Sequence, residues 1–149
     1  MKNLSSTQKA YIAGFLDGDG SIYVRMKPNS TYRYGFQIVP CIALFQSKKD
    51  QRRFEEICSL VKLGYVRERN DGMIEYTIAR EAAIRSFLRE VRPFLILKCE
   101  QADLMIQTLD AKLKVRNLDD FRALAKLVDT FRDLNYSKKR KAYIDPVET

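Results

Sequence analysis

The distribution of apolar residues along the chain predicts an alternation of helices and hairpins. Ser5 and Gln8 form a capping-box pattern, and the run from Ala10 to Leu16 that follows is apolar all the way round. We therefore expect a first helix that is buried on every side. From Ser21 to Lys27 apolar and polar residues alternate, which predicts a strand whose outer face is basic and aromatic.

A second strand and a second helix follow the first strand. The alternation resumes from Tyr34 to Gln46, and Pro40 in the middle of this strand predicts a bulge or a sheet edge. Apolar residues then recur at helical spacing from Lys49 to Leu63. Gly64 comes directly after this segment, and glycine is the residue that most often ends a helix.

The rest of the chain repeats the pattern of a hairpin followed by a helix. Asn70-Asp71-Gly72 is a strong hairpin-turn signal between two alternating segments, Tyr65 to Arg69 and Met73 to Ala79. Apolar residues at helical spacing predict three more helices, around residues 84–91, 102–109 and 121–131. The order α-β-β-α-β-β-α with further helix predicts an α+β fold whose helices cover one face of an antiparallel sheet.

Length and composition limit what this fold can do. A chain of 149 residues corresponds to about one domain, so we expect a single domain over residues 1–149 with a basic tail at 136–149. No apolar run is long enough to predict a membrane span or a signal peptide. We therefore expect a protein that acts in the compartment where it is made and is not secreted.

The charge balance favours a polyanionic partner. Lys and Arg number 27 against 19 acidic residues, a net charge of +8, which fits nucleic acid, with an anionic membrane as the weaker alternative. Histidine is absent, which excludes Ser-His-Asp triads, Cys-His nucleophiles and His-zinc sites. The three cysteines, Cys41, Cys58 and Cys99, occupy apolar positions and are interpreted as reduced structural thiols.

The segment that joins the first helix to the first strand carries the candidate chemistry. Asp17 and Asp19 lie at the C-terminal end of the helix, where the helix dipole disfavours an acid, so we expect a cation beside them. A calcium loop of the EF-hand type is excluded because its twelfth position would be Pro28. Ala10, Ala13 and Gly14 are small, and they would let another backbone approach the helix closely.

This segment, Tyr-Ile-Ala-Gly-Phe-Leu-Asp-Gly-Asp-Gly, resembles the motif of the LAGLIDADG homing endonucleases. Four further segments match members that carry a single motif: Lys27-Pro28-Asn29, Gly64-Tyr65-Val66-Arg67, Pro93 to Lys98, and Gln101-Ala102. The resemblance implies an intron-encoded, site-specific nuclease with an αββαββα fold, extra C-terminal helices and a DNA-binding saddle of antiparallel strands. It also implies an organelle (chloroplast or mitochondrion) or the cytoplasm or nucleoid of the host as its location.

The resemblance also implies roles for individual residues. Asp19 would bind a divalent metal, Mg2+ (or Mn2+), beside the scissile phosphate, with Gly18 contributing its backbone carbonyl, while Asp17 would support the helix end. Metal-assisted attack of water on phosphorus then explains a nuclease without histidine. Lys98 matches the active-site lysine of the family, which stabilises developing negative charge.

Two further active-site positions follow from the same resemblance. The strand-two glutamine of the family corresponds to Gln46 by its distance from Asp50, or to Lys48 when the Gln51-Arg52-Arg53 segment is aligned without gaps. Arg52 resembles a peripheral active-site arginine, and an exposed helix cation is the equal alternative.

One motif per chain predicts a homodimer, because a double-strand break needs an acid for each strand. Ala10, Ala13 and Gly14 would form its two-fold interface, and the target would be near-palindromic. The strand rise of roughly 3.3 Å per residue lets the dimer contact on the order of twenty base pairs of double-stranded DNA. The candidate base contacts are Tyr23, Arg25, Lys27, Asn29, Tyr32, Gln37, Arg67, Arg69, Glu75 and Thr77, and the candidate phosphate contacts are Lys138, Lys139 and Arg140.

Two other functions fit the same scaffold. An RNA-splicing maturase would bind intron RNA, alone or in addition to cleaving DNA. A non-catalytic DNA-binding regulator would use the same saddle without cleavage. Metal-dependent nicking of a target separates the nuclease from the regulator, and binding of intron RNA tests the maturase.

Overall fold

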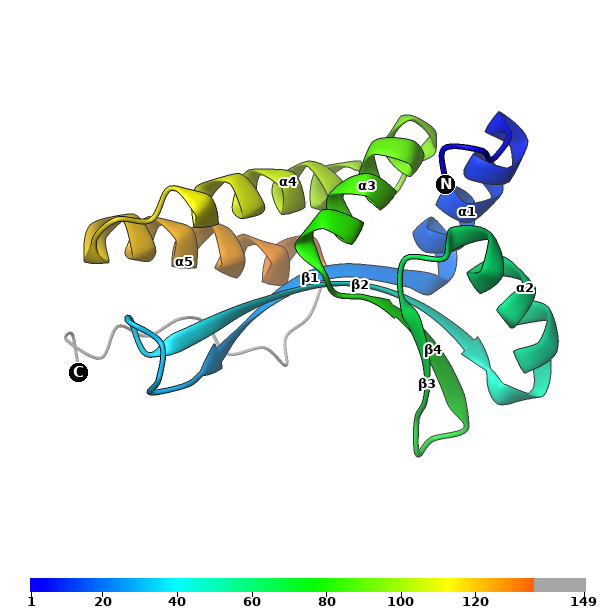
Figure 1. Cartoon of the computed structure of the whole chain (residues 1–149), viewed down its shortest axis with the longest axis horizontal. Coiled ribbons are helices and arrows are strands. Elements are labelled where there is room, and N and C mark those ends of the chain that lie inside the picture. Colours follow the sequence, from blue (N-terminus) through cyan, green and yellow to red (C-terminus); the bar gives the residue numbers. More distant parts are fainter. Residues whose placement is uncertain (136–149) are drawn as a thin grey trace.

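The computed structural model describes residues 1–135, and its elements follow the predicted order (Figure 1). The helices are α1 (Ser6–Asp19), α2 (Gln51–Val61), α3 (Glu81–Val91), α4 (Cys99–Leu113) and α5 (Leu118–Leu134), with short 3₁₀ helices η1 (Lys48–Asp50) and η2 (Arg92–Phe94). The strands are β1 (Gly20–Pro28), β2 (Phe36–Ser47), β3 (Tyr65–Glu68) and β4 (Met73–Ile78). The α+β prediction is confirmed, and the predicted basic tail lies outside the described residues.

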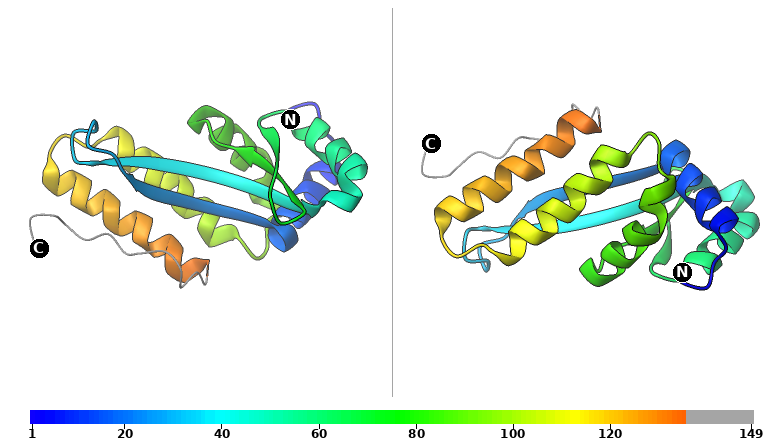
Figure 2. Two further views of the ribbon diagram at one scale, coloured as in Figure 1. Left: turned by 90° about the horizontal axis from the view of Figure 1, so that it is seen from below. Right: turned by 90° about the horizontal axis from the view of Figure 1, so that it is seen from above.

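The strands form one antiparallel sheet with helices on a single face. The sheet has the order β1-β2-β4-β3, so the two hairpins meet through β2 and β4. Figure 1 shows α3, α4 and α5 on one side of an arched sheet, and no helix of residues 1–135 lies on the opposite, concave side. Figure 2 shows the long β1–β2 hairpin lying along α4 and α5. The fold therefore leaves the sheet face opposite these helices open to a partner.

Of the two alternatives predicted for Pro40 in the long hairpin, the sheet edge is confirmed and the bulge is not. Pro40 pairs with Val24 in an unbroken register, so there is no bulge. It lies before Ile42, where pairing with β4 begins, and so it occupies a stretch of β2 with a free edge that needs no N–H donor. The strand also starts two residues later than predicted, because Gly35 has a φ of 80° that ends the turn.

Helix α1 is not buried on every side. Its N-terminus is closed by the predicted capping box between Ser5 and Gln8. Ile12, Ala13 and Leu16 are buried in the core of the chain, whereas Tyr11 and Gly14 are exposed on the opposite face. An all-apolar helix gives no amphipathic signal, so its exposed face could not be found from periodicity.

Gly64 does not end α2, and its lack of a side chain is required by close packing against β4 instead. The helix ends at Val61, and Lys62 takes the left-handed conformation with φ 54°. A Cβ on Gly64 would overlap the carbonyl oxygen of Thr77 on β4. The hydroxyl oxygen of buried Tyr76 accepts hydrogen bonds from the backbone N–H groups of Leu63 (2.8 Å) and Gly64 (2.7 Å).

The hydrophobic core lies between the sheet and its helices. The side chains of Ile22, Ile42 and Leu44 meet those of Phe87, Met105 and Phe131 there. Cys41 and Cys58 are buried and Cys99 is partly buried, none of the three in a disulfide, and burial raises the pKa of Cys58 to about 11. Among residues 1–135, no helix has both the length and the apolar character that a membrane span requires.

Candidate active site and nucleic-acid interface

The C-terminal end of α1 meets the turn that leads into α4. The carboxylate of Asp17 is 8% exposed and accepts three backbone hydrogen bonds, from the N–H groups of Ile96 (2.8 Å), Leu97 (3.1 Å) and Lys98 (3.0 Å). The expected cation beside this residue is the Lys98 ammonium group, which bonds the Asp17 backbone carbonyl, while the carboxylate itself is held by N–H donors. The N–H groups before α4 compensate its charge, as they do for anions at helix N-termini.

Gly18 and Asp19, the two residues that follow Asp17, are both exposed. Within residues 1–135 the Asp19 carboxylate has neither a hydrogen-bond nor a salt-bridge partner. It stands directly before Gly20, which pairs with Leu44 at the start of β1. An uncompensated carboxylate therefore lies where α1 runs into the sheet.

Lys98 lies at the same junction. Its backbone N–H donates to the Asp17 carboxylate, and its side-chain Nζ donates to the Asp17 backbone carbonyl oxygen at 2.6 Å. The structure therefore brings the ammonium group of Lys98 to the last turn of α1, close in sequence to Asp19. The two residues that the resemblance singled out first come from elements far apart in the chain, and Lys98 reaches the helix end that carries Asp19 through its bonds to Asp17.

The other predicted active-site residues lie around the end of β2. The Gln46 side chain borders a groove between α1 and α2, and its Oε1 accepts a hydrogen bond from the Ser47 N–H at 2.8 Å. The Lys48 Nζ pairs with Glu68 on β3. Arg52 is exposed on α2. These placements do not bring Gln46, Lys48 or Arg52 into hydrogen-bond contact with Asp19 or Lys98.

The residues at the end of α1 fit a hard divalent cation that keeps water in its coordination shell. Asp19 offers an unpaired carboxylate and Gly18 an exposed backbone carbonyl, both oxygen ligands of the kind that magnesium prefers. Among the described residues, no three Asp, Glu, Cys or His side chains cluster as a closed metal cage. An open site with one carboxylate is typical of a metal shared with substrate phosphates.

The open face of the long hairpin carries the predicted polar row on β1. Tyr23, Arg25 and Lys27 share this face, opposite Cys41, Val39 and Gln37 of β2. Burial and a hydrogen bond with Cys41 raise the pKa of the Tyr23 hydroxyl well above its usual range. Arg25 and Lys27 are exposed, and Gln37 is half-buried. The row therefore changes from a partly buried tyrosine to exposed cations along the strand.

At the tip of this hairpin, the side chain of Asn29 stabilises the turn through hydrogen bonds. Its Oδ1 accepts hydrogen bonds from the Thr31 backbone N–H (3.0 Å) and hydroxyl (2.6 Å). Tyr32 is exposed on the same loop. Of these two predicted base contacts, Tyr32 is therefore the one whose side chain is available without breaking a turn.

The second hairpin corrects part of the predicted contact set. Glu75 and Thr77 face the open side of the sheet but are only 5% and 8% exposed, because side chains of neighbouring strands cover them. Arg67 pairs with Glu75 at 2.9 Å, and this hydrogen bond raises the pKa of the guanidinium. The prediction that Glu75 and Thr77 are open to bases is wrong for this structure. Glu75 instead holds an exposed arginine.

Two aromatic residues, Phe45 and Tyr65, lie beside the predicted contacts of the second hairpin, although they were not themselves predicted to contact DNA. Phe45 lies 5.8 Å, measured from its ring centre, from the guanidinium of the predicted contact Arg69, which also pairs with Asp71 at 2.8 Å. Tyr65 is exposed on β3 with the parity of Arg67. Parity along β3 would have identified Tyr65. No sequence signal pairs Phe45 with Arg69, because these residues come from different hairpins.

The predicted dimer-interface residues separate into two groups. Ala10 and Gly14 are exposed, and a Cβ on Gly14 would meet no atom of the chain within 4 Å. Ala13 is fully buried in the core of its own chain, so it is corrected from an interface residue to a core residue.

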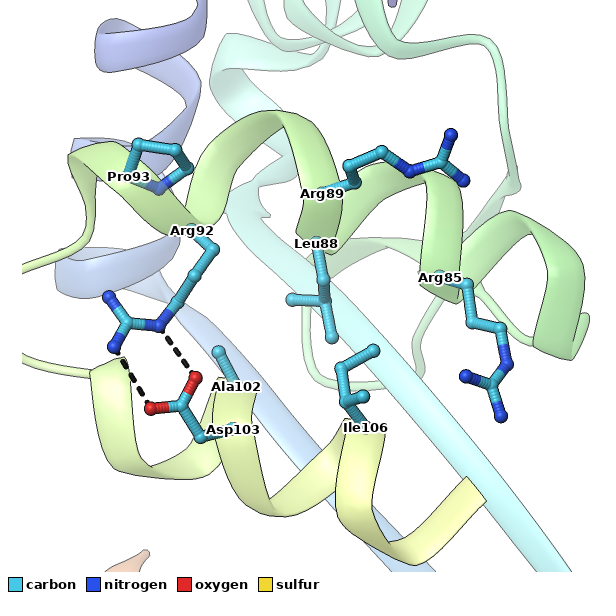
Figure 3. Close-up of a pocket in the computed structure, with 8 residues that line it drawn as sticks. All are labelled: Arg85, Leu88, Arg89, Arg92, Pro93, Ala102, Asp103 and Ile106. Atoms are coloured by element: carbon cyan, nitrogen blue, oxygen red, sulfur yellow. Dashed lines mark hydrogen bonds and ion pairs between the residues drawn. The ribbon is translucent and has the colours of Figure 1, made fainter. Parts of the chain in front are cut away.

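A separate pocket of about 410 Å³ lies on the helix side of the sheet, between α3 and α4 (Figure 3). Leu88, Ala102 and Ile106 form its apolar surface. Arg92 makes a two-pronged ion pair with Asp103 (2.7 and 2.9 Å), which lowers the pKa of that carboxyl. The charge of Arg92 is thus compensated within the chain.

Comparison with known proteins agrees with this geometry. The family model of the LAGLIDADG endonucleases matches residues 12–95. The DNA endonuclease I-CreI of Chlamydomonas reinhardtii is 33% identical over 140 residues, which cover 92% of this chain and 84% of the relative. The DNA endonuclease I-CvuI of Chlorella vulgaris is 30% identical over 131 residues, covering 88% and 81%.

Solved structures show the same fold. The complex of I-CvuI with its target superposes with a TM-score of 0.85 at 29% identity, covering 91% of this chain and 87% of that one. The archaeal intron-encoded endonuclease I-Vdi141I, bound to DNA, has a TM-score of 0.78 at 20% identity and covers 93% and 89%. Because the family model spans more than half of the residues and both relatives align over most of their length, the chain belongs to the LAGLIDADG endonuclease family.

Proposed function

We propose that this chain is a site-specific DNA endonuclease that, as a homodimer with bound Mg2+ or Mn2+, cuts both strands of a long, near-palindromic target. One observation carries the proposal. The unpaired Asp19 carboxylate and the Lys98 ammonium group lie at the junction where α1 enters the open sheet. A carboxylate for metal and a cation for developing charge are the two groups that phosphodiester hydrolysis needs in a protein without histidine.

The residues have distinct roles in this proposal. Asp19 and the Gly18 carbonyl would hold the metal, which when bound stabilises charge on the attacking and leaving oxygens. Lys98 stabilises the negative charge that develops on the phosphate. For the strand-two position we propose Gln46 or Lys48, and with Arg52 on α2 the residue there would contact the neighbouring phosphates.

The open sheet face is the proposed DNA-binding surface. Strand β1 has nine residues, which span about 30 Å at roughly 3.3 Å each. That length matches about nine base pairs at roughly 3.4 Å per base pair. Arginine, lysine, tyrosine and glutamine side chains on this face can bond phosphates and base edges.

The exposed face of α1 is the proposed interface with a second copy. Ala10, Tyr11 and Gly14 lie on it. Beside them, Ile96 and Leu97 are 82% and 72% exposed, although both are large apolar side chains. A groove of about 820 Å³ borders the same helix and is lined in part by Tyr11, Phe15, Phe54, Ile57 and Leu60. Pairing two such faces by a two-fold axis buries apolar surface and places two Asp19 side chains together.

The test begins with a target. The relative I-CvuI has been solved with its own target and with the I-CreI target. We would select cleaved sequences from a library randomised around these sites, with Mg2+ or Mn2+ present. The wild-type chain should linearise a plasmid that carries the selected site, and chelation of the metal should stop cleavage.

Asp19→Asn should abolish cleavage and largely preserve target binding, because it removes a metal ligand and leaves the sheet unchanged. Asp119→Asn is the matched control, since Asp119 is an exposed acid on α5. Metal-dependent turnover by Asp19→Asn at the rate of the control would refute the assignment. A wild-type chain that binds the selected site and never nicks it would be a DNA-binding regulator.

A further inference from the structure

Asp17 at the end of α1 and residues 96–98 before α4 are joined by hydrogen bonds to both the side chain and the backbone of Asp17. The Oδ2 atom of Asp17 accepts the N–H groups of Ile96 and Leu97, and Oδ1 accepts the N–H of Lys98. In return the Lys98 Nζ donates to the Asp17 carbonyl oxygen. A buried carboxylate and a lysine side chain thus form a ring that joins residues about 80 positions apart.

The chemistry of this ring requires a carboxylate. Three N–H donors converge on the side chain, and both of its oxygens are used. An asparagine has one acceptor oxygen and an NH₂ group, which would face at least one of the three donors without a bond. Loss of this anchor would free residues 96–98, and with them the backbone from which the Lys98 side chain extends.

We propose that Asp17 is a positioning residue for DNA cleavage, which fixes the 96–98 turn and thereby holds the Lys98 ammonium group beside Asp19. The proposal rests on the proposed nuclease function and adds to it a residue that touches neither substrate nor metal. Its effect on cleavage passes through Lys98.

A second cap in the chain provides a matched control. Asn117 caps α5 by accepting the N–H of Asp120 at 2.8 Å, and it lies at the far end of α4 from Lys98. Asn117→Ala removes a side-chain acceptor of a backbone N–H at the start of α5, as Asp17→Asn disturbs one in the turn before α4, but no candidate active-site residue depends on Asn117. A purely structural role for Asp17 predicts that the two variants behave alike.

The experiment compares wild type, Asp17→Asn, Lys98→Ala, the double variant and Asn117→Ala. Single-turnover cleavage of the selected target is measured at saturating enzyme and metal, and the Kd for the target is measured separately. Lys98→Ala should slow cleavage by roughly 10²–10³-fold. Asp17→Asn should slow it by about 10²-fold, with little change in Kd, because a small displacement of a reacting group costs that much.

The double variant decides the route. If Asp17 acts through Lys98, the double variant should be no slower than Lys98→Ala alone. Multiplied effects of the two substitutions would overturn the proposal, as would wild-type cleavage by Asp17→Asn. The metal concentration for half-maximal rate should not change in Asp17→Asn, and an increase that accounts for the whole loss would show that Asp17 acts through the metal site instead.

A second measurement covers the case in which Asp17→Asn does not fold. Hydrogen exchange of the wild-type amides at Ile96, Leu97 and Lys98 should be slow, because all three are bonded to Asp17. Exchange at the rate of an unstructured chain would overturn the proposal without any variant. A wild-type chain that cleaves no target refutes the nuclease function, whereas an active wild type with an unaffected Asp17→Asn refutes only the positioning role.

Discussion

Arg67 stands on the open sheet face with its guanidinium already held by a buried acid. The side chain of Glu75 is covered by its neighbours, and it pairs with Arg67 at 2.9 Å. A held guanidinium presents its remaining N–H groups in one orientation, which suits the two acceptors of guanine in the major groove. In the proposed DNA complex, Glu75 would therefore contribute to recognition by orienting Arg67, although its own side chain is covered.

Replacing Arg67 by alanine should relax base preference at one position in each half-site. A bidentate contact with guanine contributes roughly 1–3 kcal/mol of discrimination, so affinity for other bases at that position should change least. The measurement is a binding profile over all single-base variants of the selected target. Arg89→Ala on α3, on the helix side of the sheet, is the control and should leave the profile unchanged. An unaltered profile for Arg67→Ala would remove it from the set of base contacts.

Asp17 and Asp19 show what single residues reveal before the fold is known. The motif identified both acids and their position at a helix end. It could not show that the Asp17 carboxylate accepts three backbone hydrogen bonds, because the donors are the N–H groups of residues 96–98. Nor could it show that the Asp19 carboxylate accepts none within residues 1–135. The pairing of Glu75 with Arg67 was likewise hidden, since strand parity gives the face of a residue and not its exposure.

Among the elements, the turn between α2 and β3 is the most tightly constrained. Gly64 lies against the Thr77 backbone, and the adjacent N–H groups bond the buried Tyr76 hydroxyl. Gly64→Ala forces the two segments apart and should lower the free energy of unfolding by roughly 1–3 kcal/mol. Urea denaturation at fixed protein concentration measures the loss. Gly14→Ala adds the same methyl group in open space, and a loss of equal size there would contradict this explanation.

Helix α1 allows dimerisation to be tested apart from folding. Because a Cβ on Gly14 meets no atom of its own chain, Gly14→Leu should leave the protomer folded. In the proposed dimer the same side chain would separate the two α1 helices. Sedimentation should therefore show a folded monomer without cleavage activity. An intact, active Gly14→Leu dimer would place the interface elsewhere.

Most elements could be predicted because their signals are local. The capping box of Ser5 and Gln8 and the Asn70-Asp71-Gly72 turn depend on a few adjacent residues, and both lie where they were expected. The errors occur where a distant segment decides the outcome. Ala13 belongs to the core only because the sheet packs on that side of α1, and Gly64 is needed only because Thr77 passes beside it.

The whole molecule carries a net charge of +8, and part of its positive charge lies in the tail beyond the described residues. Lys138, Lys139 and Arg140 are predicted to bind phosphates without selecting bases. Their replacement by glutamine should weaken binding to all targets alike and lower the salt slope by about one unit for each phosphate that a subunit no longer binds. Binding profiles at two salt concentrations measure both effects, and a changed base preference would contradict the assignment.

The contact between Asp17 and residues 96–98 also determines when the protein can become active. It closes a loop of about 80 residues, so it can form only after residues 96–98 have been synthesised. During synthesis, the motif leaves the ribosome long before Lys98 does. A nascent or prematurely terminated chain would therefore carry the proposed metal ligand Asp19 without Lys98, so the proposed cleavage activity would depend on a completed fold.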